Sequence, residues 1–127
     1  MKRIKEIRKK RISVSSAKAK GRDLQKWVCQ QISEIINLPW GQDTPIESRG
    51  MGQPGVDIRL DKEAIKKFPF SVECKRQESW GIHKWIKQAK NNKRPDTNWL
   101  LICKRNHENP IVLMDAEIFF KLLSKKV

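Results

Sequence analysis

The sequence lacks the features that would place it in a membrane or around a metal–thiolate centre. It has no apolar run near the roughly 20 residues that a transmembrane helix needs, and it shows no secretory signal. Its three cysteines, Cys29, Cys74 and Cys103, are far apart and include no C-x-x-C pair. Its two histidines, His83 and His107, form no H-E-x-x-H motif. These absences exclude a disulfide scaffold and a zinc site, and they predict a cytoplasmic protein with reduced thiols and no membrane partner.

Acidic residues are also scarce: 14 Asp and Glu stand against 28 Lys and Arg, for a net charge of +14. The charge is uneven, because ten of the first 22 residues are basic and only Glu6 is acidic. We therefore expect residues 1–20 to form a flexible basic arm, with a hinge at Ser15–Gly21. Such an arm is typical of a segment that binds a polyanion, although a solubilising tail is the alternative. The arm has no Trp or Phe to hold it on a membrane, so nucleic acid is the expected partner.

The length of 127 residues suffices for one domain with one core, which we place at residues 21–127. The spacing of apolar residues and the turn residues between them predict alternating helices and strands. This order predicts an α/β fold in which a central mixed β-sheet of four to five strands is flanked by helices. The predicted helices are 22–38, a short turn at 61–68, 79–92 and 115–126, and the predicted strands are 56–60, 70–76, 98–105 and 110–114.

The stretch FPFSVECKRQESW places a carboxylate and an ammonium in an apolar strand. Side chains alternate faces along a strand, so Glu73 and Lys75 point the same way. Asp57 begins the preceding strand after a Gly-rich turn, and neighbouring strands can bring it close to Glu73. Two carboxylates at one sheet edge suit Mg²⁺, which leaves its other positions to water and phosphate, and Lys75 adds a point charge. This set of groups is suited to phosphodiester hydrolysis.

Two short motifs resemble those of the PD-(D/E)XK nuclease superfamily. Gly55-Val56-Asp57 is similar to the PD element, and Glu73-Cys74-Lys75, which is the only [D/E]-x-K in the chain, is similar to the (D/E)XK element. Gln88, on the following predicted helix, resembles a glutamine found in several branches of the superfamily. The stretches KGRDLQKWV and SRGMGQPGVDIRL resemble the first helix and the pre-catalytic turn of Holliday junction resolvase-like and phage-type endonucleases.

The resemblance implies a restriction-endonuclease-like fold with an αβββαβ core and a Mg²⁺-dependent DNA endonuclease, with Mn²⁺ as a substitute metal and no organic cofactor. It implies that Asp57, Glu73 and the Cys74 backbone carbonyl hold the metal, that Lys75 acts on the attacking water, and that Gln88 assists catalysis. The short single domain favours structure-selective or non-specific cutting over recognition of a long site, and a Holliday junction resolvase-like or phage-type nuclease of recombination, repair or phage DNA processing is the first expectation. If the protein is phage-encoded, the host cytoplasm is its expected location.

The chain departs from the resolvase pattern at one position. Resolvase-like members carry a metal-assisting glutamate on the first helix, where this chain has Gln25, so Asp23 and Glu34 are the candidate substitutes. Trp80 and Trp85 are expected either to pack in the core or to form a platform for an unstacked base. The residues expected to contact DNA are Arg22, Arg49, Arg76, Lys84 and Lys87.

Alternatives remain open at this point. Glu73 could form a simple ion pair with Arg59, and the fold could serve a non-catalytic or RNA-directed binding protein, although no RNP-like aromatic strand motif is present. Duplex DNA has two strands to cut, whereas the chain has one apparent site. We therefore expect a two-fold homodimer, formed through a strand edge or through the last helix around Phe119 and Phe120.

Overall fold

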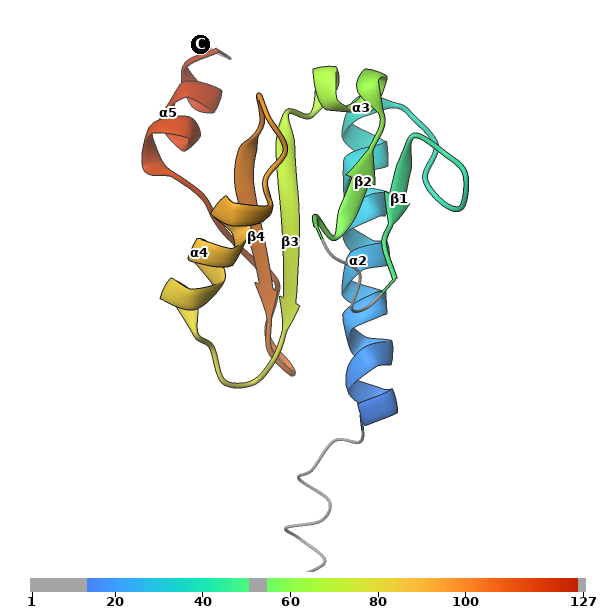
Figure 1. Cartoon of the computed structure of the whole chain (residues 1–127), viewed down its shortest axis with the longest axis vertical. Coiled ribbons are helices and arrows are strands. Elements are labelled where there is room, and N and C mark those ends of the chain that lie inside the picture. Colours follow the sequence, from blue (N-terminus) through green and yellow to red (C-terminus); the bar gives the residue numbers. More distant parts are fainter. Residues whose placement is uncertain (1–13, 51–54, 126–127) are drawn as a thin grey trace, which may run out of the picture.

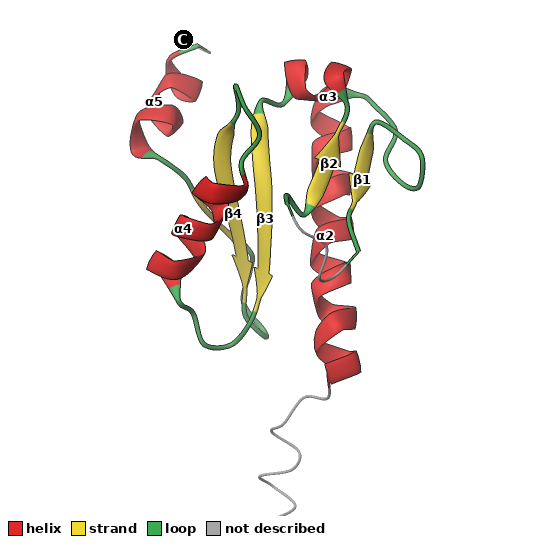
Figure 2. Ribbon diagram, viewed as in Figure 1, coloured by secondary structure: helices red, strands yellow, loops and turns green. Residues whose placement is uncertain are grey.

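The computed structural model describes residues 14–50 and 55–125 of the chain. Within these residues, helices and strands alternate and form an α/β fold, which confirms the predicted class (Figure 1). Figure 2 shows the strands side by side with helices around them. The helices are α2 (Val14–Ile36), α3 (Lys62–Lys67), α4 (Ile82–Asn92) and α5 (Ala116–Ser124), and the strands are β1 (Ile46–Ser48), β2 (Ile58–Leu60), β3 (Phe70–Arg76), β4 (Asn98–Lys104) and β5 (Ile111–Leu113).

The strands form two sheets instead of the single sheet of four to five strands that the sequence predicted. β1 pairs antiparallel with β2, while β3 pairs parallel with β4 and β4 pairs antiparallel with β5. The sheets adjoin where the Asp57 N–H donates to the Val72 carbonyl at 3.0 Å. The next donor on β3, the Cys74 N–H, is taken by the Asp57 carboxylate at 2.7 Å. In a regular sheet this N–H would bond a backbone carbonyl of the neighbouring strand. Here it bonds a side chain instead, so regular strand pairing is interrupted at this point.

Alternate residues of β3 and β4 pack against different helices. Val72, Leu100 and Ile102 belong to the same core cluster as the buried residues of α2, whereas Leu101 and Cys103 pack with Trp85 on α4. Glu73 and Lys75 lie on the α4 side of β3, because Glu73 bonds to Asn92 of α4 and Lys75 lies over the Trp85 ring. The period of two along β3 therefore places both candidate residues under α4.

Helix α2 begins earlier than the sequence indicated. It starts at Val14, so the predicted hinge at Ser15–Gly21 is wrong and this segment is helical. The segment SSAKAK contains Ala and Lys, both strong helix formers, and this propensity favours continuing the helix over a hinge. The helix ends at Ile36, and Asn37 then adopts a left-handed φ of 57°. Residues 1–13 of the predicted arm lie outside the described residues.

No helix in the described part of the chain combines the length and the apolar character that a membrane span requires. The free cysteines among these residues are Cys29, Cys74 and Cys103.

Candidate active site

Asp57 is fixed between the two sheets by its backbone and its side chain. Gly55 precedes it with a φ of 89°, a conformation that residues with a Cβ rarely adopt, and this turn leads the chain into β2. The Asp57 carbonyl accepts a hydrogen bond from the Arg49 N–H at 2.8 Å, in addition to the bonds to Val72 and Cys74. Two backbone bonds, to Arg49 and to Val72 on β3, therefore fix the residue, and the bond from the Cys74 N–H orients its carboxylate.

Glu73 is almost fully buried on β3, with 3% of its surface exposed. Its Oε1 accepts a hydrogen bond from Asn92 Nδ2 at 2.9 Å. Ser71, two residues earlier on the same face of β3, accepts from the Arg94 N–H at 2.9 Å and bonds the Thr97 hydroxyl at 2.7 Å. These bonds attach the chain just after α4 to β3, and this attachment brings Asn92 to Glu73.

The two carboxyl groups perturb one another. Burial, and next the charge of Asp57, raise the pKa of Glu73 from 4.5 to about 7, although Asn92 and Lys75 act in the opposite direction. Burial also raises the pKa of Asp57, against the lowering effects of the Cys74 N–H, a hydrogen bond with Glu73 and the charge of Lys75. Two ionised carboxylates held together in a buried place repel each other, and a bound cation would relieve that repulsion.

Lys75 joins the same group of side chains. Its Nζ lies 5.8 Å from the centroid of the Trp85 ring, within the range of a cation–π contact. Its charge lowers the pKa values of both Asp57 and Glu73, so the ammonium lies near both carboxyl groups. The structure thus brings Asp57, Glu73 and Lys75 together.

The tryptophans beside this group pack as part of the fold. Trp85 is buried, and its ring lies 6.3 Å from that of Trp80 in a tilted arrangement. The Trp80 indole N–H donates to the Gln77 carbonyl at 2.7 Å. Of the two expectations for this pair, core packing describes Trp85, whose buried ring does not present a platform to a base.

Asn92, which the sequence did not single out, is the α4 residue that bonds a candidate carboxylate. Gln88 is exposed on α4, and none of the contacts among the described residues joins it to either carboxyl group. Asn92 lies three residues after Ala89 and seven after Trp85, the two buried residues of α4. Helical periodicity places it on their face, and this spacing was the signal that could have identified it.

The basic candidates fall into three settings. The Arg49 guanidinium lies beside Gly55, since its Nη1 is 4.0 Å from where a Cβ on that glycine would be. Arg76 lies on the other face of β3, where it bonds Glu78 at 3.2 Å and Asn106 at 2.5 Å. The remaining candidates are exposed on helices: Arg22 on α2, and Lys84 and Lys87 on α4.

The acids proposed to replace a first-helix glutamate do not share the burial of Gln25. Gln25 is buried on α2, whereas Asp23 and Glu34 are exposed on the same helix. The simple ion pair between Glu73 and Arg59 is not formed, because Arg59 Nε donates to Glu47 at 3.1 Å.

The donor set fits a hard divalent cation. In the part of the chain that the structure describes, no cluster of three or more His, Cys, Asp and Glu side chains suited to a metal occurs. Mg²⁺, however, is commonly bound through only one or two carboxylates, with water and substrate oxygens completing its shell. Asp57 and Glu73 supply two carboxyl groups, and the Cys74 carbonyl adds a backbone oxygen next to them in the chain.

Comparison with known protein families supports the same interpretation. A family model described as "Phage putative PDDEXK endonuclease" matches residues 16–127. No curated protein and no solved structure gives a significant match. The match covers nearly the whole chain, so the protein belongs to this family of PD-(D/E)XK endonucleases. The resemblance drawn from the GVD and ECK motifs is thereby confirmed at the level of the superfamily.

Proposed function

We propose that the protein is a Mg²⁺-dependent endonuclease that hydrolyses phosphodiester bonds in DNA. The observation that carries this proposal is the convergence of Asp57, Glu73 and Lys75 where the two sheets adjoin. A buried carboxyl pair with raised pKa values is costly to maintain in a merely structural role. The family match supports an endonuclease but names neither the metal nor the substrate.

Each residue of the site has its own proposed role. Asp57, Glu73 and the Cys74 carbonyl would hold Mg²⁺, with Mn²⁺ as a substitute, and the bound ion would supply Lewis-acid chemistry at the phosphate. Lys75 would orient the attacking water and stabilise the additional negative charge of the pentavalent phosphate. Asn92 would act as a positioning residue, since its amide holds one oxygen of Glu73 in place. The family resemblance implies in-line attack that leaves a 5′-phosphate and a 3′-hydroxyl.

Positive charge near the site supports DNA as the substrate. Residues 79–95, which include α4, contain five basic residues and no acidic one. Lys84 and Lys87 are exposed there, and the Arg49 guanidinium lies beside Gly55. Residues 1–13 would add further phosphate contacts, because they contain seven basic residues and one acidic residue. We propose structure-selective cutting of the Holliday junction resolvase type, in recombination, repair or phage DNA processing.

The experiment is cleavage of a panel comprising a four-way junction, flap, fork, linear duplex and single strand. Mg²⁺ is compared with Mn²⁺ and with EDTA. We expect cleavage with either metal, no cleavage in EDTA, and faster cutting of branched substrates than of linear duplex. Binding without cleavage in either metal would favour a non-catalytic binding protein, and a preference for RNA in competition would favour an RNA-directed one.

A further inference from the structure

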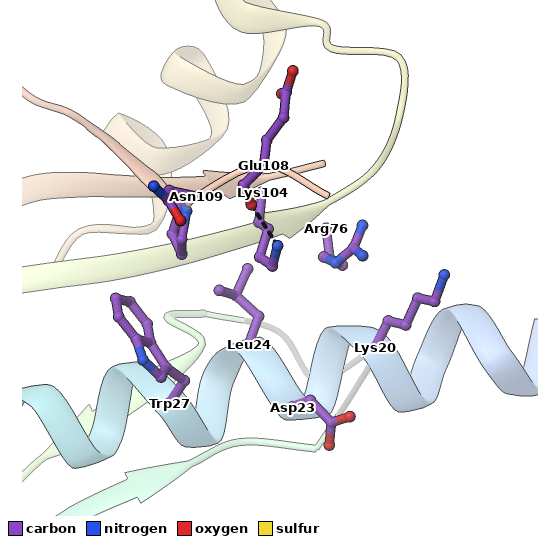
Figure 3. A pocket seen from close by; sticks show the side chains of 9 residues that line it. Lys20, Asp23, Leu24, Trp27, Arg76, Lys104, Glu108 and Asn109 are labelled. Carbon is purple, nitrogen blue, oxygen red and sulfur yellow. Dashed lines mark hydrogen bonds between the residues drawn. The ribbon is translucent and has the colours of Figure 1, made fainter. Parts of the chain in front are cut away.

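A recess lies between α2 and the carboxyl ends of the parallel strands β3 and β4. Its volume is about 470 Å³, within the range of ordinary ligand pockets. Figure 3 shows its lining side chains, with α2 on one side and the ends of β3 and β4 on the other. Its lining includes Lys20, Trp27, Arg76 and Lys104, together with the acids Asp23 and Glu108.

One wall of the recess is an exposed aromatic ring. Trp27 is 43% exposed, although it lies on a helix whose neighbouring residues Leu24 and Val28 are buried in the core. In Figure 3 its indole lies between α2 and the strand ends, facing the space on that side. An accessible indole of this kind offers a flat surface on which a nucleic-acid base can stack.

Three cations line the recess and bond oxygens of uncharged groups: Lys20 on α2, and Arg76 and Lys104 at the strand ends. Asn106 Oδ1 accepts a hydrogen bond from Lys20 Nζ at 3.0 Å and another from Arg76 Nη2 at 2.5 Å. Lys104 Nζ donates to the backbone carbonyls of Glu108 at 2.5 Å and Arg105 at 3.2 Å. Neutral oxygens do not cancel the charges of Lys20 and Lys104, so the recess favours an anion near these two lysines, whereas Arg76 also pairs with Glu78 at 3.2 Å.

The two acids among the lining residues are directed elsewhere. The Glu108 carboxylate pairs with Arg105 at 3.8 Å. Figure 3 shows the carboxylates of Asp23 and Glu108 pointing away from the space between Trp27 and Lys104. The recess therefore combines an accessible aromatic ring with three cations, of which Lys20 and Arg76 meet at Asn106.

We propose that this recess binds an unstacked nucleotide of the DNA strand, with its base on Trp27 and its phosphate among Lys20, Arg76 and Lys104. The proposal rests on the function proposed above. Arg76 follows Lys75 directly on β3, so the recess and the candidate active site lie on opposite faces of the same strand end. Because the bases of a duplex are stacked, two adjoining bases cannot reach both faces of this strand at once. A nucleotide that reaches the recess must leave the stack, which selects flaps, forks or junctions.

The test is fluorescence anisotropy with the full chain in EDTA, where no cleavage is expected. A linear duplex is compared with the same duplex carrying a single-stranded flap. We expect wild type to prefer the flap, and Trp27→Leu to lose about tenfold in flap affinity, since base stacking on an aromatic ring contributes on that order. Trp27→Phe should retain most of the preference. Trp40→Leu is the matched control, because Trp40 is 39% exposed and does not line the recess.

A charge variant tests the contribution of the cations. Lys20→Gln should weaken flap binding and flatten its salt dependence, whereas Lys66→Gln, exposed on α3 and outside the recess, should change neither. Equal flap and duplex affinity in wild type would overturn the proposal. A Trp27→Leu protein that binds the flap like wild type, or weakens on both DNAs alike, would also overturn it. Circular dichroism melting verifies that each variant is folded.

Two further results separate the possible failures. If free deoxyadenosine monophosphate displaces the flap at concentrations near the flap's own Kd, the recess is a site for free nucleotides and the strand assignment is wrong. If wild type cuts duplex with Mg²⁺ while Trp27→Leu keeps the flap preference, only the recess proposal fails. If wild type cuts no DNA but Trp27→Leu loses the preference, the nuclease proposal fails and the nucleotide pocket stands.

Discussion

The backbone N–H of Cys74 donates to Asp57 Oδ2 at 2.7 Å, and through this bond a carboxylate at the start of β2 pairs with the middle of β3. The same contact ends the regular pairing between the two sheets and fixes a candidate metal ligand beside Glu73. Structure and proposed function therefore depend on one side chain, and substitutions at Asp57 can separate the two roles.

Asp57→Asn keeps an oxygen that can accept the Cys74 N–H but removes the charge. We expect this variant to fold at least as well as wild type, because repulsion with Glu73 disappears, and to lose Mg²⁺ binding and cleavage together. Asp57→Ala also leaves the Cys74 N–H without that acceptor, and should unfold about 1–3 kcal/mol more easily than Asp57→Asn. Urea denaturation and Mg²⁺ titration measure the two effects. Equal stability of the Asn and Ala variants would show that the hydrogen bond contributes little.

The raised pKa of Glu73 predicts how stability depends on pH. Its folded pKa of about 7 exceeds the ordinary 4.5, so the folded protein retains a proton that the unfolded chain releases between these values. The resulting stabilisation is complete below pH 4.5 and is lost as the pH rises through 7. In EDTA, the Tm of wild type should therefore fall over this interval relative to that of Glu73→Gln. Above about pH 7, Mg²⁺ should raise the Tm of wild type but not that of Glu73→Gln. Parallel pH profiles for the two proteins would contradict the prediction.

Asn92 and Gln88 form a matched pair on α4. Asn92→Ala removes the donor that holds Glu73 in place, and a lost partner of a metal ligand typically costs about 10- to 100-fold in metal affinity or activity. Gln88→Ala, one helical turn earlier and exposed, should change neither by more than about twofold. Mg²⁺ titration and cleavage rates provide the comparison. The reverse order of effects would restore Gln88 to the site.

The grouping of Asp57, Glu73 and Lys75 could be predicted because the motif residues lie on one strong strand and on the turn before another. Period two along β3 predicted that Glu73 and Lys75 share a face, and both lie under α4. The division into two sheets was not predictable, since nothing in the sequence says that the Asp57 carboxylate takes a backbone donor. Helical spacing could have placed Asn92 on the buried face of α4, but its contact with Glu73 was not predictable, because it depends on how Ser71 bonds the chain after α4.

An exposed apolar surface on β5 and α5 predicts that the chain forms a dimer. Val112 is 55% exposed on β5, the outer strand of its sheet, and Phe120 is 64% exposed on α5. We propose that a second copy of the chain covers this surface in a two-fold dimer, which would give two sites for two DNA strands. Phe120→Lys should shift the dimer to monomer in light scattering, whereas Ile35→Lys, at an exposed apolar residue of α2, should not. A monomeric wild type that still makes paired cuts would contradict the dimer.

The most direct measurement of the central claim is the cleavage rate of Lys75→Ala. This variant keeps Asp57 and Glu73, so it should remain folded and should still bind Mg²⁺ and DNA. It lacks the ammonium that we place at the transition state, and its rate on the best substrate of the panel should fall about a thousandfold. A rigorously purified Lys75→Ala protein that cuts DNA at the wild-type rate would contradict the assignment of this site to phosphodiester hydrolysis.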